Sequence, residues 1–129
     1  MRLHHVQVAC PVGGEDVVRR FLVEGLGMTE VDKPDDLEAR GGAWFRAYDE
    51  SGRVTAEVHV GVEEPFAPAR KAHPALVVEG VDAVAARLEG LGFEVDHGQR
   101  DSFPGHLRCH CFDGHGNRVE LLEPRLPGA

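Results

Sequence analysis

The feature that most constrains the fold of this chain is an internal repeat. Three segments of the first half return in the same order in the second half: His5-Val6-Gln7-Val8-Ala9 as His73-Pro74-Ala75-Leu76-Val77, Glu24-Gly25-Leu26-Gly27-Met28 as Glu89-Gly90-Leu91-Gly92-Phe93, and Val54-Thr55-Ala56-Glu57-Val58 as Asn117-Arg118-Val119-Glu120-Leu121. Each copy spans roughly 60 residues, which predicts two equivalent structural modules. Each copy also begins with a histidine and ends with a glutamate, and these four side chains can converge on one metal ion.

The composition indicates one small, acidic domain. A chain of 129 residues can bury roughly two thirds of its unfolded surface. We expect a single domain of two modules, about 1–63 and 72–124, joined by a connector at 64–71. The net charge of −8 argues against nucleic acid or an anionic membrane as a partner. No apolar run approaches the roughly 18 residues of a membrane span. The 3 cysteines lack Cys-x-x-Cys spacing, so we expect neither disulfides nor a zinc knuckle, and a cytoplasmic protein.

Hydrophobic periodicity predicts the same order of elements in both modules. Alternating residues indicate strands, apolar residues at helical spacing indicate helices, and Gly-rich or Asp-rich segments indicate turns. The predicted elements of the first module are a strand at 2–9, a helix at 15–26 and strands near 28–32, 39–48 and 53–62. Those of the second are a strand at 73–78, a helix at 82–91 and strands near 93–96, 106–112 and 117–123. The predicted fold is therefore α+β, with two β-α-β-β-β modules forming paired curved sheets around a cleft.

The strand alternation predicts which side chains face that cleft. Successive side chains of a strand point to opposite faces, and the apolar set must pack against the helices. The other set is polar and aromatic: His5, Gln7, Trp44, Arg46, Tyr48, Glu57, His59, His73, Arg108, His110 and Glu120. The same alternation turns His4 toward the helix side or the rim. Because an ordinary core does not hold so many ionisable groups, the concave face is predicted to be a site.

The order and the motifs resemble the vicinal oxygen chelate superfamily, which includes glyoxalase I, fosfomycin-resistance proteins, bleomycin-resistance proteins and extradiol dioxygenases. Leu3-His4-His5-Val6 is similar to the first strand of that family, and Leu26-Gly27-Met28 to the end of its first helix. Asp113-Gly114-His115-Gly116-Asn117-Arg118-Val119-Glu120 resembles the Asp-Pro-x-Gly-Asn-x-x-Glu of its last hairpin, with Gly114 in place of the proline. The resemblance covers the chain to about residue 124.

The resemblance implies a metal site. His5, Glu57, His73 and Glu120 match the positions that hold a divalent ion in glyoxalase-I-like members. Without Glu57, the remaining three match the two-histidine, one-carboxylate set of the extradiol dioxygenases. His59 lies two residues after Glu57 on the same face and is its rival. The implied ion is Ni²⁺, Zn²⁺, Mn²⁺ or Fe²⁺, acting as a Lewis acid on neighbouring oxygens of a small substrate in lyase, isomerase or dioxygenase chemistry.

Two functional classes stay open at this stage. In a metal-dependent enzyme, Glu57, His110 and Arg108 are the candidate catalytic residues. Trp44, Arg46, Tyr48 and Gln7 are the candidate substrate-binding residues. His110 with Arg108, or Trp44 with Tyr48, would equally serve to fill or close the barrel. The alternative is a metal-free protein that sequesters a small molecule, as bleomycin-resistance proteins do. The resemblance also implies a homodimer, because sites of this superfamily often form across paired modules.

Overall fold

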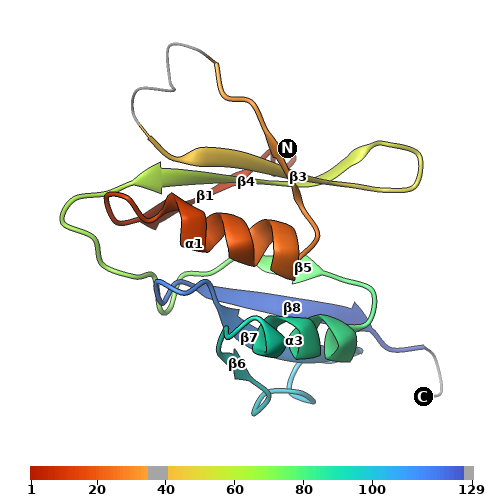
Figure 1. Ribbon diagram of the computed structural model, residues 1–129. Helices are drawn as coiled ribbons and strands as arrows, with labels where there is room; N and C mark the ends of the chain where they lie inside the picture. The colour runs from red at the N-terminus through yellow and green to blue at the C-terminus, as the bar shows by residue number, and fades with distance from the viewer. Residues whose placement is uncertain (35–40, 127–129) are drawn as a thin grey trace.

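The computed structural model describes residues 1–34 and 41–126. In these residues the chain forms two four-stranded mixed sheets, each with its own helix (Figure 1). The first sheet has the order β1-β4-β3-β2, formed by β1 (Val6–Cys10), β4 (Val54–Val62), β3 (Ala43–Tyr48) and β2 (Thr29–Val31). The second has the order β5-β8-β7-β6, formed by β5 (Ala75–Val77), β8 (Arg118–Pro124), β7 (His106–Phe112) and β6 (Val95–Asp96). The predicted α+β fold of two β-α-β-β-β modules is confirmed.

The first strand of each module pairs in parallel with the last. Val6 of β1 lies opposite Val58 of β4, and Ala75 of β5 lies opposite Glu120 of β8, whereas the other strand pairs are antiparallel. A parallel pair cannot be closed by a short turn, so the intervening chain crosses over and lays its helix on one face of the sheet. The helix thereby covers one face of each sheet, and the polar side chains of the strands lie on the opposite face.

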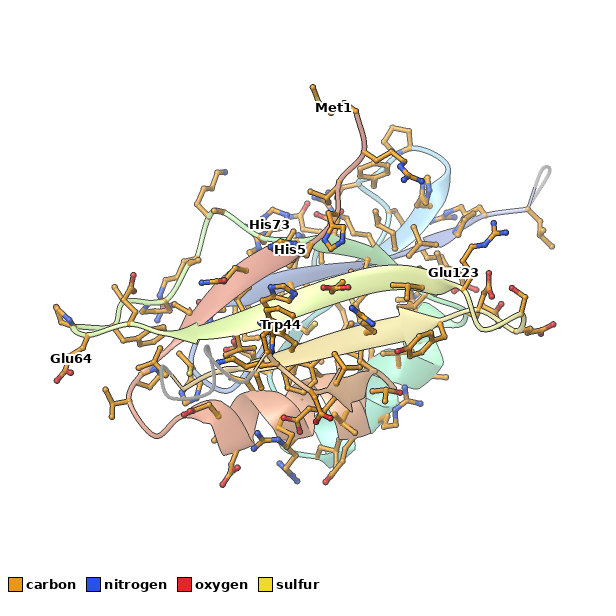
Figure 2. The ribbon with its side chains drawn as sticks, turned by 90° about the horizontal axis from the view of Figure 1, so that it is seen from above. Met1, His5, Trp44, Glu64, His73 and Glu123 are labelled. Carbon is orange, nitrogen blue, oxygen red and sulfur yellow. The ribbon has the colours of Figure 1, made fainter. Side chains whose placement is uncertain are left out.

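The helices cover the apolar faces of both sheets. Helix α1 (Glu15–Arg19) continues directly into a π-helical segment at Arg20–Gly25, and α3 spans Val81–Gly90. Both helices lie on the same side of the strands in two perpendicular views (Figures 1 and 2). They bury their apolar stripe against alternate strand residues, and the buried side chains include Val18, Phe21, Leu22, Val58, Val60, Val81, Ala85, Leu88, Cys109, Cys111 and Leu121. In the described residues no helix is long and apolar enough to cross a membrane.

The last hairpin ties the two modules together. The side-chain amide of Asn117 donates to the carbonyl oxygen of Ala9 at 2.7 Å and to the Asp113 carboxylate at 2.8 Å. Its carbonyl oxygen accepts from the backbone N–H of Ala69 at 2.9 Å. Asn117 is 2 % exposed, so these groups have no access to water as an alternative partner. One side-chain amide therefore binds backbone groups of the first module and of the connector, and the Asp113 carboxylate of its own hairpin.

Two predicted strands differ from the structure in ways that affect the sites. The first strand begins at Val6 rather than at residue 2, so the strand alternation does not govern residues 2–5. The predicted strand 39–48 begins at Ala43: residues 39–40 lie outside the described residues, and Gly41 and Gly42 have φ of +74° and +84°, which a strand excludes. A register shift between Ala47 and Tyr48 ends the regular pairing of β3 with β4.

Candidate metal and ligand site

A cluster of metal-ligating side chains lies on the second sheet. The ligand atoms of His73, His110 and Glu120 all lie within 4.8 Å of one another. Glu120 of β8 lies directly opposite His110 of β7, and an antiparallel pair holds such side chains next to each other. His73 comes just before β5, and its Nε2 lies 2.9 Å from Oε1 of Glu120. The strand register of this module therefore builds the cluster from three separate chain segments.

The protonation of this cluster favours a cation. Burial opposes the ionisation of Glu120, but hydrogen bonds from His73 and Arg108 outweigh it and hold the pKa of Glu120 below its usual value. The Nδ1 of His73 lies 2.7 Å from the carbonyl oxygen of Lys71, so it carries the proton that donates there. The Nε2 of His73 therefore faces the Glu120 carboxylate, and either a proton or a metal ion can lie between these two atoms.

His110 gives the cluster its most unusual feature. Its side chain is 1 % exposed, and neither ring nitrogen has a hydrogen-bond partner among the described residues. Burial is the main reason that the pKa of His110 falls below its usual value, so the ring is neutral. Its Nε2 lies 3.6 Å from Oε1 of Glu120. A buried imidazole without a partner costs free energy, and a divalent ion beside Glu120 would supply a partner for Nε2.

Arg108 also contacts the Glu120 carboxylate. Its Nη2 donates to Oε1 of Glu120 at 3.2 Å, its Nη1 donates to Ser102 Oγ at 2.9 Å, and its guanidinium lies 5.6 Å from the centre of the Phe103 ring. These contacts fix the guanidinium in place, because hydrogen bonds and a cation–π contact act on it together. The structure thus places Arg108 as a neighbour that orients the Glu120 carboxylate.

The first module holds a different constellation. Nε of Arg46 donates to Oε1 of Glu57 at 2.8 Å, and Nε2 of His59 lies 2.7 Å from Oε2 of Glu57. These hydrogen bonds, the one from His59 foremost, hold the pKa of Glu57 below its usual value. The His59 ring is stacked between Trp44, at 4.1 Å and 3°, and His5, at 4.0 Å and 20°. Glu57 and His59, predicted as rival ligands, are thus bonded to each other.

A second group of ligating atoms includes the N-terminal histidines. Ligand atoms of His4, His5 and Glu57 lie within 4.8 Å of one another, and the two histidine Nδ1 atoms are 2.9 Å apart. His4, expected on the helix side or the rim, turns to this group because the residues before Val6 are not in a strand. The four ligands implied by the family resemblance are thus grouped two and two: His5 with Glu57, and His73 with Glu120. The side chains of His5 and His73 both lie on the side of the strands away from the helices (Figure 2).

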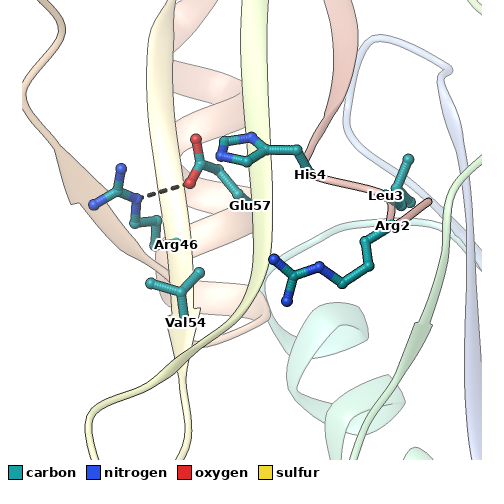
Figure 3. Close-up of a pocket in the computed structure, with 6 residues that line it drawn as sticks. All are labelled: Arg2, Leu3, His4, Arg46, Val54 and Glu57. Carbon is teal, nitrogen blue, oxygen red and sulfur yellow. Dashed lines mark hydrogen bonds and ion pairs between the residues drawn. The ribbon is translucent and has the colours of Figure 1, made fainter.

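The predicted substrate residues line three separate hollows. Gln7 and Trp44 line a cavity of about 240 Å³ together with His59. Arg46 lines a cavity of about 550 Å³ with Glu57, Arg2, Leu3, His4 and Val54 (Figure 3). Tyr48 lies beyond the register shift of β3, is 44 % exposed and borders a different groove of about 1080 Å³.

Two features of these sites go beyond the sequence prediction. His110 was expected in the cleft, either as a catalytic residue or with Arg108 as a pair that closes the barrel, and the register with Glu120 also places it in the group that could hold a metal ion. The strand pairing of the last hairpin was the signal available for this. Arg2 and His4 were not predicted to line a cavity, because the strand was expected to begin at residue 2.

The fold and these sites define a class of protein. The chain matches the model of the Glyoxalase/Bleomycin resistance protein/Dioxygenase superfamily over residues 2–121. A Bacillus anthracis protein assigned to the glyoxalase family is 39% identical, with 97% of this chain and 100% of that chain covered and a TM-score of 0.80. This protein therefore belongs to the glyoxalase/bleomycin resistance protein/dioxygenase superfamily.

More distant structures show the same fold. The genomically encoded fosfomycin resistance protein FosX from Listeria monocytogenes is 15% identical, with 98% and 95% of the two chains covered and a TM-score of 0.72. TnmS3, an antibiotic binding protein from Streptomyces sp. CB03234, is 24% identical, with 97% and 99% covered and a TM-score of 0.65. Among curated proteins, none matches the chain significantly.

Proposed function

We propose that the protein is a divalent-metal-dependent enzyme that acts on a small molecule with two neighbouring oxygens, by lyase, isomerase or dioxygenase chemistry. The observation that carries this proposal is the buried His110, whose two ring nitrogens lack a partner among the described residues beside His73 and Glu120. Two imidazoles and one carboxylate form a ligand set that suits Ni²⁺, Zn²⁺, Mn²⁺ or Fe²⁺.

The proposed metal centre begins with His73 and Glu120, which the sequence and the cluster both support. His110 is the third ligand within the second module. His5 and Glu57 remain the ligands predicted from the first module by the family resemblance. When bound, the ion would act as a Lewis acid on two neighbouring substrate oxygens. In our proposal Arg108 keeps the Glu120 carboxylate oriented.

The first module supplies the proposed base and the substrate contacts. Where Glu57 does not bind the ion, it is the proposed base: it is 7 % exposed, Arg46 and His59 keep it ionised, and it could accept a proton from the substrate. Trp44 and Gln7 offer a flat aromatic face and an amide at the edge of one cavity. Tyr48 stays a predicted substrate residue from the neighbouring groove.

A second function is favoured by one observation. The stacked rings of Trp44, His59 and His5 form an aromatic column, a surface that binds planar molecules without a metal. In this alternative the protein sequesters a small molecule, as the bleomycin-resistance type does, and catalyses no reaction. It predicts stoichiometric ligand uptake that a chelator does not change.

The metal content of protein purified without a His-tag separates the two functions. The first step is elemental analysis, and the second is titration of the EDTA-treated protein with each of the four ions. We expect near-stoichiometric metal, lost in His73→Ala and retained in His97→Ala, a control at an exposed histidine. Protein without metal that also binds none in titration would refute the metal-dependent enzyme and favour the sequestering protein. A homodimer, also proposed from the family, is tested by light scattering of the same preparation.

A further inference from the structure

We propose that the cavity of about 550 Å³ at the N-terminal segment is an oxyanion subsite, in which Arg46 and Arg2 bind a carboxylate or phosphoryl group of the ligand. This inference deepens the proposed function, on which it rests for the reacting part of the substrate. It assigns the substrate to a chemical class: small molecules that carry an anionic group in addition to the oxygens that reach the metal.

The charge of the cavity lining is the first argument. The lining contains two arginines and one histidine against a single carboxylate, in a chain whose net charge is −8. Figure 3 shows Arg46 and Arg2 on opposite sides, with Glu57 and His4 between them. A concave site with two guanidinium groups concentrates positive potential locally on a protein of negative net charge, which attracts anions.

The hydrogen bonding of the guanidinium groups is the second argument. Arg46 binds Glu57 through Nε alone, at 2.8 Å, and a guanidinium offers four further N–H donors. In the described part of the chain no side-chain hydrogen bond of Arg2 is present, so all N–H donors of its guanidinium are available. A planar guanidinium can donate two parallel hydrogen bonds to the oxygens of one carboxylate or phosphoryl group.

The state of Glu57 is the third argument. Arg46 and His59 occupy both of its oxygens, so its negative charge is already offset. The remaining N–H donors of Arg46 therefore face the cavity beside a carboxylate whose charge is already offset, and they favour an anion there.

The fluorescence of Trp44 provides a direct assay, since Trp44 is the single tryptophan of the chain. It is stacked on His59, which is bonded to Glu57, which is bonded to Arg46. EDTA-treated protein is titrated with inorganic phosphate and, separately, with acetate, at constant ionic strength set by sodium chloride. Isothermal calorimetry repeats each titration, so the result does not depend on the fluorophore alone.

We expect saturable binding of at least one of the two anions. Arg46→Gln and Arg2→Gln should each weaken it at least about tenfold, because each removes charge-assisted hydrogen bonds. Arg100→Gln, in the second module, is the matched control and should bind as the wild type does. Binding of phosphate alone assigns a phosphoryl group, binding of acetate alone a carboxylate, and binding of both the shared oxyanion chemistry.

Two results would overturn the subsite: no saturable signal by either method, or equal affinity in the wild type and both arginine variants. Either result would leave the proposed metal centre untouched, because the titration is done without metal. Conversely, a protein that binds no metal but does bind the anion would refute the proposed enzyme and keep the subsite.

Discussion

Replacing Glu120 with glutamine tests the metal centre with the least disturbance to the fold. Glutamine keeps the shape of the side chain and the Oε1 acceptor, so it still receives hydrogen bonds from His73 and Arg108. What is lost is the negative charge, and with it the neutralising partner of Arg108 at 3.2 Å. Changing a residue that ligates or orients a metal weakens binding about 10- to 100-fold. The expected loss of metal-binding free energy is therefore about 1.4–2.8 kcal/mol.

The assay is competition for the ion between the EDTA-treated protein and a chromophoric chelator. Glu120→Gln should give a dissociation constant at least about tenfold above that of the wild type. Glu89→Gln, at a half-exposed side chain of the same module, should leave it unchanged. A thermal melt of the metal-free variant confirms that it folds. A folded Glu120→Gln protein with wild-type metal affinity would show that Glu120 is not a ligand, and the proposed centre would fail with it.

Three further predictions concern stability. Asn117→Ala should lower the free energy of unfolding by about 3 kcal/mol in urea titrations, because it leaves backbone groups of the first module and of the connector without their partners. A loss below about 1 kcal/mol would contradict the tie between the last hairpin and the first module. Gly42→Ala should lower the free energy of unfolding far more than Gly52→Ala, although both glycines have φ above +80°. A Cβ at Gly42 would lie 2.1 Å from the Val60 carbonyl oxygen, whereas a Cβ at Gly52 would point into open space, so Gly52→Ala should lower it by only about 1–2 kcal/mol. Equal melting temperatures for the two variants would refute the steric argument. The pKa of Glu57 is lower in the folded protein than its ordinary value of 4.5, so its contribution to stability is present above pH 4.5 and is lost as the pH falls through the folded pKa. In urea titrations at a series of acidic pH values, the unfolding midpoint of Glu57→Gln should therefore fall less steeply with falling pH than that of the wild type. An equally steep fall would argue against the hydrogen bonds of Glu57.

The fold could be predicted because the repeat and the periodicity are local signals that agree in both modules. Strand alternation at Glu57 and Val58 places one side chain with the polar face and the other in the core, as expected. The two copies also reinforce each other, since a pattern weak in one copy is checked by its counterpart. The superfamily followed from the same agreement in order and spacing.

The details of the sites could not be predicted, because they depend on where strands begin and how they pair. Residues 2–5 were predicted to belong to the first strand, but the pairing of β1 with β4 begins only at Val6, opposite Val58. Tyr48 shares the alternation of Trp44 and Arg46 but lies past a register shift that the residues do not announce. Whether His110 is a ligand or a general acid depends on its lack of hydrogen-bond partners, a property of the folded surroundings rather than of the residue.

The parallel pairing of the first and last strands in each module has a consequence for folding kinetics. The β1 segment has no partner on its paired edge until β4 has been made, and β5 likewise depends on β8. Each sheet therefore closes only after a loop that includes the whole module is ordered, and such non-local pairing makes folding slow. During synthesis the first module can complete its sheet before β8 of the second module has been made, but Asn117 is made only with the last hairpin. The formation of that hairpin is thus the step that locks both modules at once.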